Sequence, residues 1–257
     1  MADRHAILKN GCKEIAWQNG KAISVMAKWS TEHAGSSSHI HQSLWNLTGK
    51  QPLFFDKDAD HGMSKLMQHY MAGQLAYARE ITWFLARYIN SYKRFQAGTF
   101  AATKAIWSRD NRTAGFRLCG ESSNAISVEC RIGGADLNPY LAFAALLAAG
   151  IAGIKDKTPL EAGFEGDAYH GEQLREIPKT LREAIETMRQ SEMLRTALGD
   201  EVIDHYVRTA EWEPSENHVS RQEVSMPRSA GMRESGVRMA REKAMDGFFN
   251  DLLGLFL

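Results

Sequence analysis

A short run near the start of the chain has the alternating pattern of a strand. A Gly/Ser turn at residues 35–38 leads into the sequence from His39 to Leu44. If this run is a strand, side chains two positions apart share a face, so that His39, His41 and Ser43 point the same way. Two imidazoles and a hydroxyl on one face suit a metal ion or a phosphate group. The alternative is a half-exposed strand with incidental histidines.

A second alternating run occupies residues 126–132. Ser127, Glu129 and Arg131 would face one side of this strand, and the apolar residues between them would face the other. A carboxylate beside a guanidinium indicates a metal ligand next to an anion clamp. A surface ion pair is the alternative interpretation of the same two residues. Residues 115–119 alternate in a similar way.

The remaining periodicities predict a chain that mixes helices with strands. The first helix carries Ile7, Leu8, Cys12, Ile15 and Ala16 on one side, which should face the core. Asn138 and Pro139 have the residue types of an N-cap and a first helical position. Helices are expected over 3–19, 64–92, 138–154, 179–191, 200–212 and 238–257, and strands over 22–27, 39–44, 103–107, 115–119 and 126–132. After Glu213 the sequence loses its clear periodicity, which divides the chain into a main region, 1–213, and a tail, 214–257.

Composition excludes some classes of partner. The chain has 31 basic and 31 acidic side chains, which argues against a broad electrostatic surface for nucleic acid or anionic membrane. No run of residues is long and apolar enough to span a bilayer, and the first residues lack the apolar core of a signal peptide. The three cysteines form no C-x-x-C pair, which favours free thiols in a reducing cytoplasm.

The polar groups on strand faces and strand ends form one constellation. Its members are His39, His41, Ser43, Arg94, Arg112, Arg117, Glu129 and Arg131. Arginine is suited to planar recognition of carboxylate and phosphate. A metal-ligand set together with an arginine cluster therefore indicates phosphoryl transfer that involves an acidic substrate. A metal hydrolase that uses the two histidines is a weaker interpretation, because it leaves the arginines without a role.

Four blocks of sequence, in order, resemble the glutamine synthetase superfamily over residues 3–212. The run from Ala34 to Ser43 is similar to the ATP-region signature of that family. The later blocks are Asn90 to Arg94, Asn111 to Arg117, and Val128 to Arg131 followed by the segment 138–144. The resemblance implies an α+β fold, namely part of a catalytic domain in which an antiparallel-rich, curved half-barrel sheet packs with helices.

The resemblance also implies roles for individual residues. The family uses ATP to phosphorylate the γ-carboxylate of glutamate, and ammonia or an amine then displaces phosphate. By position, His39 and Glu129 would bind Mg²⁺ or Mn²⁺. Gly35, Arg94 and Arg131 would hold glutamate, Arg112 and Arg117 would stabilise the transferring phosphoryl group, and His41, Ser43, Arg112 and Ser127 would line the nucleotide site. Family members form homo-oligomeric rings whose active sites lie between subunits.

Several departures from the family pattern shape the expected function. The family supplies further metal-binding glutamates and a small N-terminal domain from sequence before the first helix, so we expect this chain to be a C-terminal portion that is inactive alone. Asn124 and Ser127 replace expected cations, and Ala34 replaces an expected asparagine. Phe100 stands where glutamine synthetases carry a glutamate, which favours an amine larger than ammonia. A catalytically inactive structural or assembly protein is the alternative.

Overall fold

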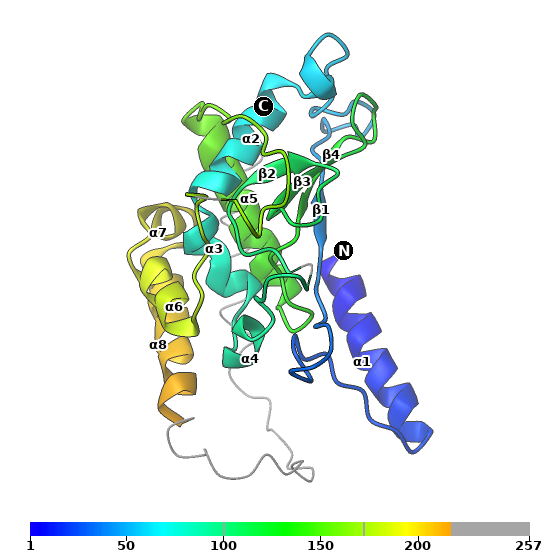
Figure 1. Ribbon diagram of the computed structural model, residues 1–257, viewed down its shortest axis with the longest axis vertical. Coiled ribbons are helices and arrows are strands. Elements are labelled where there is room, and N and C mark those ends of the chain that lie inside the picture. The colour runs from blue at the N-terminus through cyan, green and yellow to red at the C-terminus, as the bar shows by residue number, and fades with distance from the viewer. Residues whose placement is uncertain (100, 172, 217–257) are drawn as a thin grey trace.

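The computed structural model describes residues 1–99, 101–171 and 173–216, which form a mixed α+β fold (Figure 1). The helices are α1 (Ala2–Gln18), α2 (Lys65–Ala76), α3 (Ala78–Leu85), α4 (Ile89–Tyr92), α5 (Pro139–Lys155), α6 (Leu181–Arg189), α7 (Glu192–Leu198) and α8 (Asp200–Glu216), with a 3-10 turn at Asp60–Gly62. The strands are β1 (Ile40–Gln42), β2 (Trp107–Arg109), β3 (Phe116–Cys119) and β4 (Ser127–Cys130). The helix expected over 238–257 and the position of Phe100 lie outside the described residues.

The four strands form one open sheet in the order β1-β4-β3-β2. Strand β4 runs antiparallel to both of its neighbours, whereas β2 and β3 are parallel. The alternation predicted for β1, β3 and β4 is confirmed, because Ile40, Leu118 and Val128 are buried on one face. The expected α+β class and the predominance of antiparallel pairing are therefore also confirmed.

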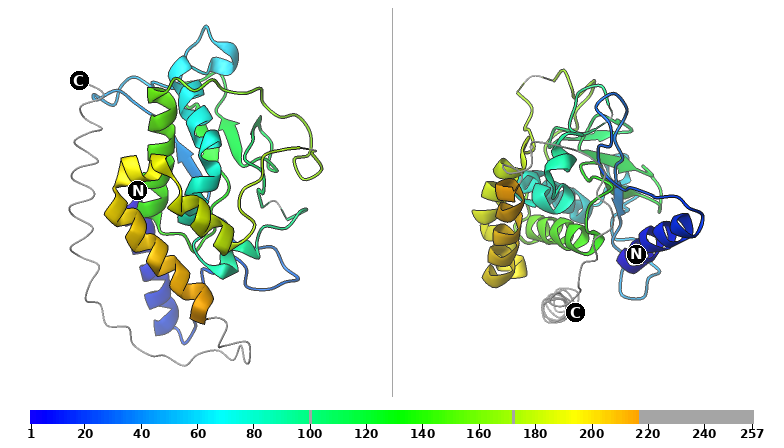
Figure 2. Two further views of the ribbon diagram at one scale, coloured as in Figure 1. Left: turned by 90° about the vertical axis from the view of Figure 1, so that its left-hand side faces the viewer. Right: turned by 90° about the horizontal axis from the view of Figure 1, so that it is seen from below.

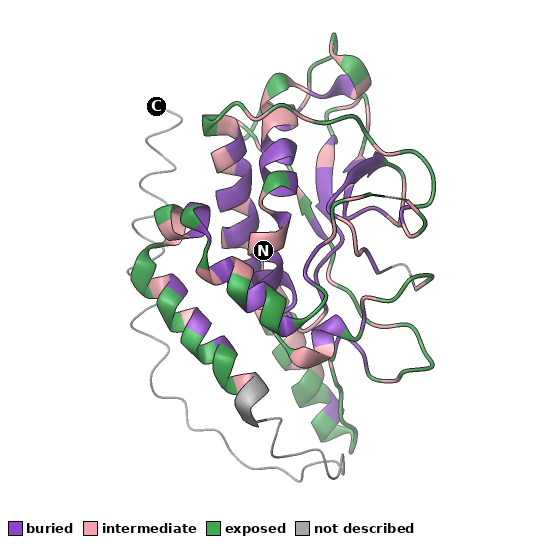
Figure 3. Cartoon of the chain, turned by 60° about the vertical axis from the view of Figure 1, so that its left-hand side comes forward, coloured by how far each residue is buried: buried purple, intermediate pink, exposed green. Residues whose placement is uncertain are grey.

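Helices α2 and α5 pack together against the apolar side of the sheet (Figure 3). Helix α5 begins as its sequence predicts, since the Asn138 side chain accepts hydrogen bonds from the backbone of Tyr140 and Leu141. The two helices approach closely at a pair of glycines, where a Cβ atom on Gly73 would lie 2.7 Å from the Cα of Gly153. This close contact fixes the distance between α2 and α5, the two helices that support the sheet.

The long helix predicted over 64–92 is wrong, because the chain breaks there into α2, α3 and α4. Tyr77 caps both α2 and α3, and Ala86 leaves helical geometry with a φ of −143°. Neither position carries Gly or Pro, so no local signal marks the breaks. Tertiary packing provides the reason: α2 packs mainly on α5, whereas α3 packs mainly on α6 and also on α5. The strand expected over 103–107 is also misplaced, since β2 begins at Trp107, and α7 was not predicted.

The first 29 residues depart most from expectation. Helix α1 forms, but its predicted buried side is wrong, since Ile7, Leu8 and Ile15 are exposed to 71%, 66% and 62%. The strand predicted over 22–27 is also wrong: the segment is extended, pairs with no described strand and exposes Ile23 and Met26. Apolar periodicity indicates which side can be buried, but burial needs a neighbour, and the described residues provide none here. Among the described helices, none has the length and apolar character needed to cross a membrane.

Candidate active site

The polar face of the sheet is organised around the side chain of Glu129 on β4. Because β4 lies between β1 and β3, Glu129 stands opposite His41 on one side and Arg117 on the other. Arg117 Nε lies 2.6 Å from Glu129 Oε2, and His41 Nε2 lies 3.6 Å from Oε1. The carboxylate is buried, with 2% of its side chain exposed. The register of three strands thus places a carboxylate, an imidazole and a guanidinium in one row.

Arg131 and His39 also contact the carboxylate of Glu129. Arg131 Nη1 donates a hydrogen bond to Glu129 Oε1 at 3.0 Å, and His39 Nδ1 lies 3.0 Å from the same oxygen. Burial, and then the neighbouring Arg131 charge, lower the pKa of His39 below its ordinary value. At neutral pH the imidazole of His39 is therefore uncharged, which is the form that binds metal ions.

Arg94 lies beside the Gly/Ser turn and is buried, with 4% of its surface exposed. Its Nη2 donates to the carbonyl oxygen of Ile132, and its Nε has no hydrogen-bond partner among the described residues. Burial lowers the pKa of Arg94 to about 10. A Cβ atom on Gly35 would overlap the Ala27 carbonyl oxygen and lie 2.8 Å from Arg94 Cγ. Gly35 therefore allows the turn to lie directly on this guanidinium.

Backbone hydrogen bonds tie this turn to the segment before it. The Ala27 carbonyl oxygen accepts from Ser36 N at 2.9 Å, and the Ser36 carbonyl accepts from Ala135 N at 3.1 Å. Both backbone groups of Lys28 bond to the side-chain amide of Asn90. Three regions that are distant in sequence thus hold the turn in place.

The sequence-predicted site residues fall into groups in the structure. His39, His41, Arg117, Glu129 and Arg131 come together in one cluster, with Arg94 and Gly35 beside it.

The other predicted residues lie outside that cluster. Ser43 follows β1 and accepts a hydrogen bond from Trp45 Nε1, and Ser127 stands at the start of β4 opposite Cys119. Arg112 is exposed, and its connection to the cluster is through its carbonyl oxygen, which accepts from Arg131 Nε at 3.3 Å. Its side chain forms no hydrogen bond or ion pair with any residue that the structure describes.

Three residues near the cluster were not predicted. Asp110 lies 3.4 Å from Arg117 Nη1, and Ser37 Oγ lies 3.1 Å from His39 Nε2. Cys119 shares the polar face of β3 with Arg117, and its Sγ is 3.9 Å from Glu129 Oε2. The alternation of β3 could have identified Cys119, since it lies two positions after Arg117. Asp110 and Ser37 lie in loops, where no periodic pattern indicates the direction of a side chain.

The cluster fits a divalent metal ion only in part. No group of three or more histidine, cysteine or acidic side chains within the described ranges is arranged to hold a metal. Glu129 and His39 could supply two ligands, and water and phosphate oxygens commonly complete the coordination of Mg²⁺. The residues present therefore suit an ion that is shared with a phosphate-bearing ligand.

A buried carboxylate among imidazoles and arginines, on one face of an α+β sheet, has the chemistry that suits binding of phosphate and carboxylate groups. Residues 1–227 match the family model for the catalytic domain of glutamine synthetase, and the chain belongs to this family. The resemblance inferred from four sequence blocks is thereby confirmed.

Two relatives and one solved structure show how far the similarity extends. The chain is 44% identical to the γ-glutamylethanolamide synthetase GlnA4 of Streptomyces coelicolor, over 79% of this chain and 43% of the relative. It is 39% identical to a glutamate–isopropylamine ligase of a Pseudomonas species, over 82% of this chain and 46% of the relative. A GmaS/ADP complex superposes with a TM-score of 0.78 at 27% identity, covering 86% of this chain and 52% of that one. The chain thus spans about half the length of the curated relatives it matches.

Proposed function

We propose that the protein takes part in ATP-dependent ligation of the glutamate γ-carboxylate to ammonia or an amine. In this reaction a carboxylate oxygen attacks the γ-phosphorus of ATP, ADP leaves, and γ-glutamyl phosphate forms. The amine nitrogen then attacks the carbonyl carbon of the γ-glutamyl phosphate, phosphate leaves, and the nitrogen loses a proton. The names of both relatives describe ligases or synthetases of γ-glutamyl compounds, which supports the same class of reaction here.

The observation that carries this proposal is the buried Arg94 guanidinium beside Gly35. A buried charge is costly unless an opposite charge compensates it. The structure describes no carboxylate in an ion pair with Arg94, although its pKa of about 10 keeps it charged at neutral pH. A glutamate carboxylate would compensate this charge and satisfy the free Nε. Gly35 leaves the space through which the substrate backbone could approach.

The remaining residues have the roles that the family resemblance implies. Arg131 would hold glutamate together with Arg94, and Arg117 and Arg112 would stabilise the oxygens of the transferring phosphoryl group. His41, Ser43 and Ser127 would line the nucleotide site. His39 and Glu129 would bind Mg²⁺ or Mn²⁺, and such an ion would neutralise negative charge on phosphate oxygens.

We further propose that the acceptor is an amine larger than ammonia. Phe100, which cannot accept a proton, motivates this choice from the sequence, and it lies outside the described residues. The relatives named for ethanolamide and isopropylamine support it. A cytoplasmic location in nitrogen metabolism and assembly into a homo-oligomeric ring belong to the same proposal, as the family resemblance implies.

Substrate binding can be measured as the rise in melting temperature that L-glutamate causes with ADP and Mn²⁺ present. We expect Arg94→Met to abolish the rise that glutamate adds, because the buried cation is removed. Arg109→Met is the matched control, since Arg109 pairs with Glu121 on the surface and should leave that rise intact. Equal responses in the wild-type chain and Arg94→Met would refute the role of Arg94.

Turnover separates the ligase from the alternative of a non-catalytic assembly protein. We expect no phosphate release by the 257-residue chain alone, because its cluster offers a single carboxylate to the metal. Release should appear when the part of GlnA4 that has no match in this chain is supplied, and should be faster with ethanolamine or isopropylamine than with ammonium. Nucleotide binding that is absent under both conditions would favour the assembly protein.

A further inference from the structure

The first 29 residues expose an unusual share of the apolar surface. Twelve large apolar side chains are exposed within the described residues, and eight of them lie in this short stretch. The open face, as we call it, consists of Met1, Ile7, Leu8, Ile15, Trp17, Ile23, Met26 and Trp29. Exposed apolar patches of this kind mark sites of interaction with other polypeptides.

Helix α1 contributes one side of the open face. Leu8 and Ile15 are separated by two helical turns, so they project from the same side of the helix, with Ile7 next to them. Ala16, which is next to Ile15 around the helix, is buried, and α1 packs against α5. Figure 1 shows α1 at the edge of the molecule, beside the extended segment that follows it. The helix thus buries a small residue and exposes its larger apolar residues.

The extended segment 22–26 contributes the second part. Its sequence, Ala-Ile-Ser-Val-Met, has the composition of a strand. The backbone groups of residues 22–25 form no backbone hydrogen bond with any described residue, and Met26 N donates only to the Ser24 hydroxyl. A strand-like segment with unpaired backbone groups is a template for the addition of another strand.

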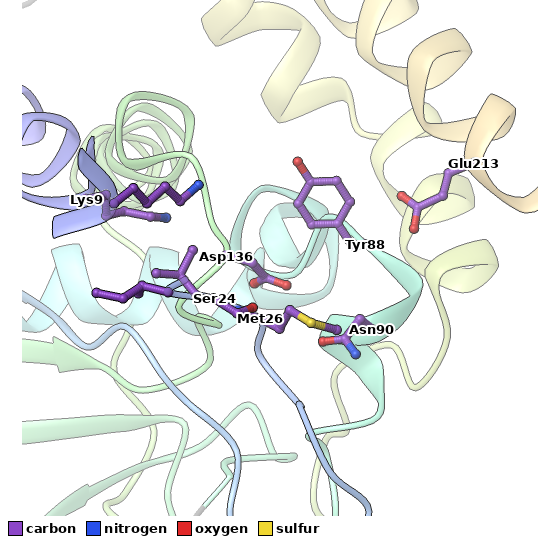
Figure 4. A pocket seen from close by; sticks show the side chains of 10 residues that line it. Lys9, Ser24, Met26, Tyr88, Asn90, Asp136 and Glu213 are labelled. Carbon is purple, nitrogen blue, oxygen red and sulfur yellow. The ribbon is translucent and has the colours of Figure 1, made fainter. Parts of the chain in front are cut away.

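A groove runs beside this segment and contains charges of both signs. It has a volume of about 590 Å³ and is lined by Ile23 to Met26, Tyr88 and Asn90, with Lys9 and Lys13 from α1 and with Asp136 and Glu213. Figure 4 shows Lys9 and Glu213 on opposite sides of it, with Asp136 and Tyr88 between them. Burial raises the pKa of Glu213 and lowers that of Lys9. A groove lined by both apolar and charged side chains suits a polypeptide ligand.

We propose that the open face binds the part of a glutamine synthetase-like polypeptide that has no counterpart in this chain, adding a strand along residues 22–26 and apolar side chains on α1. The lengths favour this occupant, since the chain spans only 43% of GlnA4 and 52% of the GmaS chain. More than half of each relative is therefore available to cover the face. A second copy of this chain is the alternative occupant, and it would be detected as a homodimer of the chain alone.

The test is co-expression of the 257-residue chain with the unmatched part of GlnA4 as a separate polypeptide, without nucleotide or substrate. We expect a one-to-one complex by size-exclusion chromatography with light scattering. The amides of residues 22–26 should also exchange with deuterium at least tenfold more slowly than in the chain alone, because they become paired. Neither measurement depends on ligase activity.

Variants locate the interface. Leu8→Lys combined with Ile15→Lys should weaken the complex at least tenfold, because two charges would be buried against the partner. Ser24→Pro should do the same, because it removes a backbone donor from the segment. Leu47→Lys is the control, since Leu47 is as exposed as Leu8 but lies outside the open face. No complex, a homodimer of the chain alone, or equal binding by all variants would each overturn the proposal.

Discussion

The polar cluster around Glu129 and the open face on residues 1–29 reverse the usual distribution of side chains. The cluster buries a carboxylate and the guanidinium of Arg131, while the open face exposes isoleucine, leucine and tryptophan. The two regions differ in whether the side chains have suitable partners within the chain. In the cluster, strand pairing places opposite charges next to one another within the chain. On the open face the large apolar side chains remain 44–81% exposed among the described residues. The carboxylate of the first region is paired with arginines within the single chain, whereas the apolar side chains of the second region remain exposed.

The largest effect is expected when the cluster loses its carboxylate. Glu129→Gln leaves Arg117 and Arg131 without their counter-charge, and breaking such a buried pair costs about 3–5 kcal/mol of stability. Urea unfolding, followed by circular dichroism, measures the loss. The control is Glu121→Gln in a surface ion pair with Arg109, where the cost should be below about 1 kcal/mol. Similar urea midpoints for the two variants would show that the ion pairs of Glu129 do not stabilise the chain.

The same substitution on two helices compares buried with exposed apolar side chains. Ile203→Ala on α8 removes a fully buried side chain and should cost about 2–5 kcal/mol. Ile15→Ala on the open face should change the stability of the free chain by less than about 0.5 kcal/mol. Thermal unfolding of both variants measures the difference. A large loss for Ile15→Ala would mean that the open face is already covered in the isolated chain.

Two glycines give a smaller and opposite pair of effects. Gly35→Ala should cost about 1–3 kcal/mol, because its Cβ would overlap the Ala27 carbonyl and contact Arg94. Gly11→Ala should stabilise the chain by about 0.5–1 kcal/mol, because Gly11 lies in α1 with no atom within 4 Å of the new Cβ. Chemical unfolding distinguishes the two signs. A destabilised Gly11→Ala variant would contradict the open arrangement of α1.

The sequence was most informative where the pattern is local. The alternation around His41 and Glu129 identified the polar face, because successive side chains of a strand must point to opposite sides. Asn138 marked the start of α5 for an equally local reason. These features depend on backbone geometry alone, so no knowledge of distant residues was needed to find them.

Prediction failed where the outcome depends on distant neighbours. The break at Tyr77 follows from the separate packing of α2 and α3, which a continuous run of helix-forming residues does not reveal. Ile15 was assigned to the core because periodicity identifies an apolar side without showing what covers it. Asp110 was missed because it reaches Arg117 from a loop with a φ of 39°. The division into 1–213 and 214–257 remains a prediction.

The carbonyl group of Ala27 lies between the open face and the polar cluster around Glu129. It ends the unpaired segment, accepts the hydrogen bond of Ser36, and lies directly beneath Gly35. A polypeptide that binds along residues 22–26 would therefore also fix the position of the Gly/Ser turn relative to Arg94. If the polypeptide raises the affinity of the chain for glutamate by some factor, glutamate must raise the affinity of the chain for the polypeptide by the same factor.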